Sequence, residues 1–174
     1  LDTSYLITTL VQEIPRVTDV VSNAMKHAAQ VSAAGSFTQD TFIGLSSANK
    51  AITPNVEALR SAVSKSMQQN SDIRATLSNA VQEAVSEILG FENWVSQQIL
   101  DPDEIQVNVA AVEQKSAQVL SKIDSLINRT LPAIEQLLEQ RKAEAQFWSG
   151  IALIVSIAAV GLAVYLLLGF YFSV

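Results

Sequence analysis

Cysteine is absent from this 174-residue sequence, and histidine occurs once, as His27. Without cysteine the chain has no disulfide, no thiolate metal site and no cysteine nucleophile, and a lone histidine has no second one with which to hold a metal. Gly-rich phosphate-binding loops are also missing. His27 falls beside the apolar face of its predicted helix, so we expect a solvated flank residue. We therefore predict a protein that is not an enzyme and that needs no cofactor and no metal.

Positive charge is scarce, because 11 Lys and Arg stand against 17 Asp and Glu, for a net charge of −6. Nucleic-acid-binding surfaces need clustered Lys and Arg, so the composition argues against a nucleic-acid partner. Carboxylates such as Glu83 and Glu87 recur at helical spacing. In the simplest interpretation they form a solvated helix face or pair with neighbouring Lys and Arg.

Charge of either sign is missing from residues 151–174. A helix of this length rises roughly 36 Å, and the hydrocarbon core of a bilayer is roughly 30 Å thick. Phe147 and Trp148 lie at one end of the run and further aromatic residues lie towards the other, as is typical of membrane interfaces. We therefore predict a transmembrane helix over residues 147–174, with the lipid bilayer as partner. The alternative, a buried core helix, would be uncharged over a shorter stretch.

Strand signals are lacking too, since there is no sustained apolar–polar alternation and no hairpin dipeptide. Apolar residues instead recur every three or four positions along four segments, which places each set on one face of a helix. We predict helices near residues 3–34, 38–68, 72–99 and from 108 to the end. We call the inward-facing row of each helix its seam. The expected seam residues are Ile7, Leu10, Ile14, Val17, Val21, Ala24, Ala28 and Val31; Phe42, Leu45, Asn49, Ile52, Val56, Leu59 and Val63; Leu77, Val81, Ala84, Ile88, Phe91 and Val95; and Val109, Val112, Ser116, Val119, Ile123, Leu126, Thr130, Ala133 and Leu137.

Four amphipathic helices with short connections bury their apolar faces against one another, so we predict an all-α fold, an antiparallel four-helix bundle over residues 1–146. Residues 133–149 contain no glycine or proline, so the last helix is expected to continue directly into the transmembrane helix. Pro15, Pro54 and Pro132 lie inside predicted helices. Each marks a local kink or helix restart, or else a hinge with a signalling role.

Three polar residues replace apolar ones on the predicted seams: Asn49, Ser116 and Thr130. A seam asparagine commonly specifies helix register, and Ser or Thr hydroxyls bond back to carbonyls of their own helix. The alternative is that the three residues line a small polar pocket inside the bundle or at a dimer interface. They are therefore the candidate ligand-binding residues.

Two motifs, one at the start of the sequence and one before its apolar run, resemble parts of the same family pattern. "LDTSYLITTLVQEIPRVTDVV" opens the chain, and "TLPAIEQLLEQR" precedes the apolar run. Together they resemble the helical extracytoplasmic sensor region of bacterial transmembrane receptors of the methyl-accepting chemotaxis protein type, which also occurs on histidine kinases and diguanylate cyclases. The matching positions are Asp2, Ser4, Tyr5, Leu6, Ile14 and Pro15, and then Leu131, Pro132, Ile134, Leu137, Leu138 and Arg141.

This resemblance implies a receptor of the inner (plasma) membrane with its bundle facing the periplasm or exterior. It also implies a small-molecule ligand. The identity of that ligand does not carry over, because no ligand-binding arginine motif of the amino-acid-sensing chemoreceptors is evident. Since the first residue is Leu rather than Met, we expect the sensor to be N-terminally incomplete here, and we expect an output domain to follow Val174.

A helix that enters the bilayer without a flexible linker passes on a small displacement, which a Gly/Ser linker would absorb. Ligand binding shifts a bundle between two packings by its differential affinity for them. We therefore predict ligand sensing and transmembrane signalling, with Pro132, Phe147 and Trp148 in signal transmission. A tail-anchored helical interaction protein is the alternative that fits the same pattern.

A second apolar line runs beside the last seam. It either widens the core face of a monomer or meets a second copy of the chain, and we predict the homodimer, because symmetric dimers need a self-complementary surface. The residues of this line are Leu120, Ile127, Leu131, Ile134 and Leu138.

Overall fold

The computed structural model describes residues 6–69 and 71–172, of which residues 10, 69, 140, 141 and 143–172 are described by their backbone only. Within these residues all regular structure is helical, which confirms the predicted all-α class. In chain order the elements are η1 (Thr9–Glu13), α2 (Ile14–Ala34), α3 (Gln39–Lys50), α4 (Ile52–Gln69), α5 (Ser71–Val95), η2 (Ser96–Leu100) and α6 (Val109–Phe172), where η marks π-helix.

The chain divides into two compact units, Leu1–Ile134 and Glu135–Val174. This boundary reflects contacts within the chain. The predicted boundary after residue 146 reflects a change of composition, and it stays a prediction.

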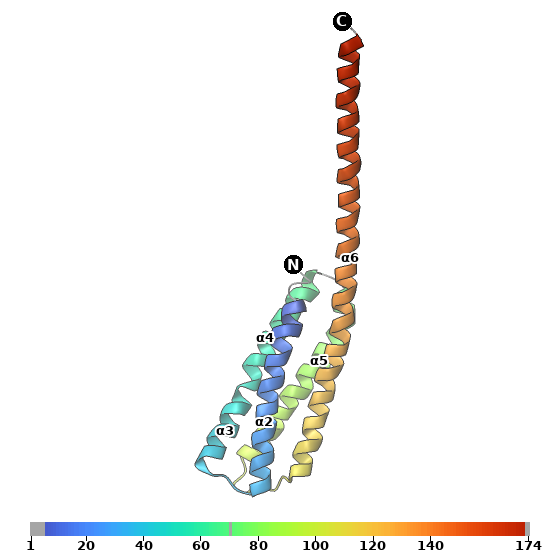
Figure 1. Ribbon diagram of the computed structural model, residues 1–174. Coiled ribbons are helices and arrows are strands. Elements are labelled where there is room, and N and C mark those ends of the chain that lie inside the picture. Colours follow the sequence, from blue (N-terminus) through green and yellow to red (C-terminus); the bar gives the residue numbers. More distant parts are fainter. Residues whose placement is uncertain (1–5, 70, 173–174) are drawn as a thin grey trace. The chain divides into compact units, whose positions relative to one another are not determined.

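Within the first unit, successive long helices run in opposite directions (Figure 1). α2 packs against α3 and α4, and α4 packs against α5. The first stretch of α6 buries Val112, Val119 and Leu126, each at most 1% exposed. Burying a side chain of this kind stabilises the fold by about 1.5–3 kcal/mol, so the seams account for the cohesion of the unit.

The start of the first helix corrects one part of the predicted seam. Ile7 is 42% exposed, whereas Leu6 and Thr9 are buried. Thr9 and Ile14, five positions apart, are both buried, because the π-helical hydrogen bonds of η1 put an extra residue into this turn. A uniform three–four spacing extrapolated back from Ile14 therefore misplaces Ile7, whereas the side chain of Leu10, also predicted on the seam, lies outside the described residues.

From Ile14 onward, the predicted seam of α2 is buried as expected. Pro15 lies in the first turn of α2, which follows the π-helical turn η1 without a break, so the helix lacks one backbone donor at this position. Gly35 ends the helix with φ 66°, a left-handed conformation that glycine adopts without strain, and its N–H donates to the Val31 carbonyl at 3.0 Å.

The second predicted helix is divided into α3 and α4 by a turn at Ala51. Thr38 begins α3 with a capping box, in which its hydroxyl accepts from the Thr41 N–H at 3.2 Å. Pro54 lies in the first turn of α4, so it marks a helix restart. Phe42 is 45% exposed, which corrects its predicted seam position. It lies in the first turn of α3, and its ring packs edge-on against Phe37 with centroids 5.4 Å apart.

The predicted seam of α5 is buried throughout, from Leu77 to Val95. α5 passes directly into η2, where the Asp101 N–H donates to the Ser96 carbonyl at 2.8 Å. The loop that follows contains Pro102, as the sequence predicts. Asn108 then caps α6, since its Oδ1 accepts from the Ala111 N–H at 2.9 Å.

α6 is assigned as helix from Val109 to Phe172, with Pro132 in its interior. No helix among the residues whose side chains are described combines the length and the apolar character that a membrane crossing requires. The predicted transmembrane helix, residues 147–174, lies outside those residues.

Candidate functional site

Asn49 is the most constrained of the predicted site residues. It is 2% exposed, and its Nδ2 donates to the Glu92 carbonyl at 3.1 Å and to the Ser96 hydroxyl at 2.9 Å. Beside it, the Thr53 hydroxyl donates to Glu92 Oε2 at 2.7 Å. The Oδ1 atom of Asn49 is buried and has no partner among the described residues. Asn49 thus ties α3 to the junction of α5 and η2, which is the geometry that register specification requires.

Thr130 and Ser116 differ from Asn49 in their surroundings. Thr130 is 1% exposed, and its hydroxyl donates to the Leu126 carbonyl of its own helix at 2.7 Å. Thr130 therefore bonds back to a carbonyl of its own helix, which is one of the two interpretations given above for a polar seam residue. Ser116 is half-buried. No hydrogen bond among the described residues joins any two of Asn49, Ser116 and Thr130, and their predicted ligand-binding role stays a prediction.

The residues predicted to transmit a signal lie on α6. Pro132 is exposed in the helix interior, where proline removes one backbone hydrogen bond, two residues after the back-bonded Thr130. Both features bend helices. The side chains of Phe147 and Trp148 lie outside the described residues, so their predicted role stays a prediction.

His27 is half-buried, which corrects the expected solvated position. A Cβ atom placed on Gly44 would lie 2.9 Å from Cε1 of His27, so the imidazole rests on the backbone of α3. Its Nδ1 is buried without a hydrogen-bond partner among the described residues. The heptad pattern placed His27 beside the seam, and the missing side chain of Gly44 lets α3 cover that flank.

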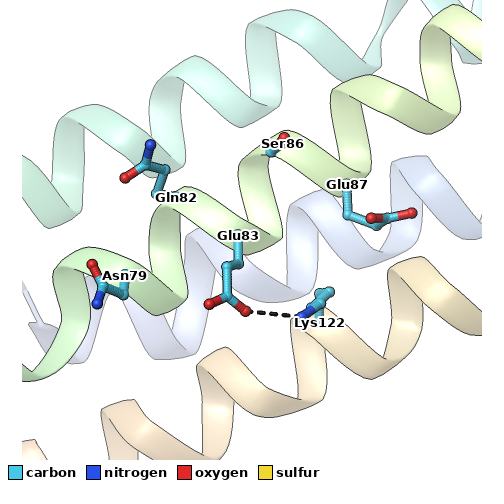
Figure 2. A pocket seen from close by; sticks show the side chains of 6 residues that line it. All are labelled: Asn79, Gln82, Glu83, Ser86, Glu87 and Lys122. Atoms are coloured by element: carbon cyan, nitrogen blue, oxygen red, sulfur yellow. Dashed lines mark hydrogen bonds and ion pairs between the residues drawn. The ribbon is translucent and has the colours of Figure 1, made fainter.

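A polar trough runs between α5 and α6. One part of it, a hollow of about 420 Å³, is lined by Asn79, Gln82, Glu83, Ser86, Glu87 and Lys122 (Figure 2). A second hollow of about 630 Å³ adjoins the first and shares Glu87 and Lys122 with it. The further residues that line the second hollow are Gln114, Lys115, Ala117, Gln118 and Ser121.

An ion pair crosses the trough. Lys122 Nζ on α6 lies 2.8 Å from Glu83 Oε2 on α5. The hydrogen bond from Lys122, and then its positive charge, lower the pKa of Glu83 from its ordinary value. Figure 2 shows the Lys122 side chain reaching Glu83, with Glu87 one helical turn further along α5. Glu83 thus has a lysine partner, but this partner lies on another helix rather than at helical spacing on α5, and the side chain of Glu83 also remains largely exposed, as a solvated helix face would be.

Glu87 and Lys115 have a different environment. Both are half-buried, both line the second hollow, and neither has a hydrogen bond or ion pair within the part of the chain that the structure describes. The hollow therefore presents one carboxylate and one ammonium without partners, together with amide and hydroxyl groups. These groups are of the kinds that hydrogen-bond or pair with polar molecules. Sequence reasoning missed Lys115 and Lys122, although their seven-residue separation places them on one helix face.

Among the described residues, no group of three His, Asp or Glu side chains is placed to hold a metal ion. The chain matches no known family model, no curated protein and no solved structure. The resemblance to bacterial sensor regions therefore depends on the two terminal motifs, and its functional content is a proposal.

Proposed function

We propose that this chain is the extracytoplasmic ligand-sensing and transmembrane signalling segment of a bacterial receptor of the chemoreceptor type. The observation that carries the proposal is α6, a helix from Val109 to Phe172 without an intervening loop. Its first half contributes buried seam residues to the first unit, and its last part contains the uncharged run 151–174. A histidine kinase or diguanylate cyclase receptor uses the same kind of sensor, so the output class is open.

The fold that we propose is an antiparallel four-helix bundle whose last helix continues into a transmembrane helix. In this arrangement α3 and α4 together form the second helix. The packing of α2 on α3 and α4, and of α4 on α5, supports it, as do the alternating helix directions in Figure 1. The ion pair between Glu83 and Lys122 adds a link from α5 to α6.

The mechanism that we propose is a small displacement of α6. A ligand that favours one packing of the helices shifts their equilibrium by its differential affinity, and typical coupling free energies are about 1–3 kcal/mol. A helix without a glycine-rich linker conveys such a shift along its axis, since each of its turns is hydrogen-bonded to the next. Pro132 and the back-bonded Thr130 are features that favour bending of a helix, so the shift is proposed to change the direction of α6 near these residues.

The working unit that we propose is a homodimer. Leu120 and Leu131 of the second apolar line are each 43% exposed and Leu138 is 49% exposed, whereas Ile127 is half-buried and Ile134 is buried. The three leucines therefore do not simply widen the core face. Near the start of the first helix, Ile7 and Val11 are 42% and 63% exposed. A second copy of the chain is the partner that offers an identical, self-complementary apolar surface about a two-fold axis.

Sidedness in the membrane tests the proposal. We introduce single cysteines into the cysteine-free chain at Ser64 and Ser78, both exposed on the first unit, and at Ala158 in the uncharged run. A membrane-impermeant maleimide added to intact bacterial cells should label the first two positions and leave the third unlabelled. Labelling of Ser64→Cys and Ser78→Cys only after the cells are broken would instead indicate the tail-anchored interaction protein.

A further inference from the structure

The second hollow of the trough contains charges of both signs that the protein does not neutralise. Glu87 on α5 and Lys115 on α6 both line it, both are half-buried, and neither has a partner among the described residues. Lys122 lies between the two hollows, but its ammonium is held by Glu83 at 2.8 Å. Glu87 is therefore left with a carboxylate that no lysine of the trough neutralises.

An unpaired charge at such a position is available to a ligand group of opposite charge. Glu87 and Lys115 do not meet each other directly, although they line the same hollow of about 630 Å³. A molecule that carries an ammonium at one end and a carboxylate at the other would satisfy both groups at once. Charge-assisted hydrogen bonds of this kind are stronger than neutral ones.

We propose that this hollow binds a small zwitterion, with its ammonium on Glu87 and its carboxylate on Lys115. The side chains of Gln114, Gln118 and Ser121 line the same hollow and supply hydrogen-bonding groups of both kinds. A simple cation or a simple anion satisfies only one of the two charges and leaves the other unpaired. The site therefore selects for molecules that carry both charges.

The bound zwitterion bridges α5 to α6, since Glu87 belongs to one helix and Lys115 to the other. It adds a second link beside the Glu83–Lys122 pair and so favours one separation of the two helices. This consequence rests on the proposed function, because α6 is the helix proposed to carry the signal. Binding itself does not rest on that proposal.

Titration calorimetry on the full chain in detergent micelles tests the site. The probes are unbranched ω-amino acids with two to six carbons, each compared with the alkylamine and the alkylcarboxylate of equal length. We expect one or two lengths in the series to bind at least tenfold more tightly than both monofunctional analogues. Equal affinities throughout, or no binding by any ω-amino acid, would overturn the proposal.

Charge-removing variants assign the binding to the two residues. Glu87→Gln and Lys115→Gln should each weaken binding of the preferred amino acid at least tenfold, with an unchanged circular dichroism spectrum. The control is Glu113→Gln, an exposed position on α6 close to Lys115, and it should leave binding unaltered. Unchanged affinity in either of the first two variants would also overturn the proposal. If the amino acid binds but does not change disulfide cross-linking between the α6 helices of two copies, the result counts against the proposed signalling mechanism and not against the proposed binding site.

Discussion

At the scale of single residues, the heptad pattern predicted the buried positions of Asn49 and Thr130 but not those of Thr9 and Ser66, and it did not predict what Asn49 contacts. Asn49 and Thr130 are buried at the predicted seam positions. The partners of Asn49 come from Glu92 and Ser96, more than 40 residues away in sequence. Spacing along one helix holds no information about which turn of another helix faces it, so these contacts had to come from the structure.

Replacing Asn49 by alanine tests the importance of this contact. Asn49→Ala removes two hydrogen bonds and leaves a small cavity, so we expect a loss of about 2–3 kcal/mol in the free energy of unfolding. The comparison variant is Asn93→Ala, which changes the same side chain at an exposed position of α5. Denaturant unfolding followed by circular dichroism measures both, and equal stabilities for the two variants would show that Asn49 holds nothing in register.

The Glu83–Lys122 pair predicts a pH dependence. Its carboxylate has a lowered pKa in the folded chain, so the unfolded state takes up its proton first as the pH falls. The stabilisation is therefore complete above the unfolded pKa of about 4.3 and is lost as the pH falls through the lower folded value. The melting temperatures of wild type and Glu83→Gln should differ at pH 7 and converge towards pH 3.

The size of this difference is expected to be small, because both side chains of the pair are largely exposed. Glu104→Gln, in the exposed loop before α6, is the control and should follow the wild type at every pH. A difference for Glu83→Gln that grows as the pH falls would contradict the assigned direction of the pKa change.

At the scale of elements, helix positions were predictable because the apolar spacing, Gly35 and Pro102 are local signals. Within the described residues 6–69 and 71–172, the predicted ranges 3–34, 72–99 and 108 to the end correspond closely to the observed helices. The π-helical turn of η1 was not predictable, since it changes the hydrogen-bond register without changing the composition. That single turn explains why Leu6, rather than Ile7, is buried.

The contact of α2 with α3 at His27 and Gly44 gives a prediction for a pair of elements. In the interior of a helix alanine is favoured over glycine by about 1 kcal/mol, so Gly44→Ala should stabilise the chain if nothing opposes it. Here the added Cβ would meet the His27 ring at 2.9 Å, so the ring must move. We therefore expect Gly44→Ala to stabilise His27→Ala chains more than chains with His27, in a double-mutant cycle of unfolding free energies. Equal effects in both backgrounds would place the ring elsewhere.

At the scale of the whole molecule, the sequence predicted the helical class and the order of the long helices. It did not predict the polar trough, because Glu87 and Lys115 belong to different helices and come together through the pairing of α5 with α6. The proposed signalling function follows from a property of one element, namely that α6 belongs both to the buried seam of the first unit and to the uncharged run.

A disulfide cross-linking scan along α6 in membranes tests this central claim most directly. Single cysteines are placed at each position from 138 to 160 of the cysteine-free chain, and cross-linked dimers are quantified after mild oxidation. If α6 is one helix on the two-fold axis of a homodimer, cross-linking should peak every three or four positions, in the phase of Leu131 and Leu138, and should keep that phase into the uncharged run. An absence of cross-linking in folded, membrane-inserted protein, or a loss of phase between residues 138 and 151, would contradict the account.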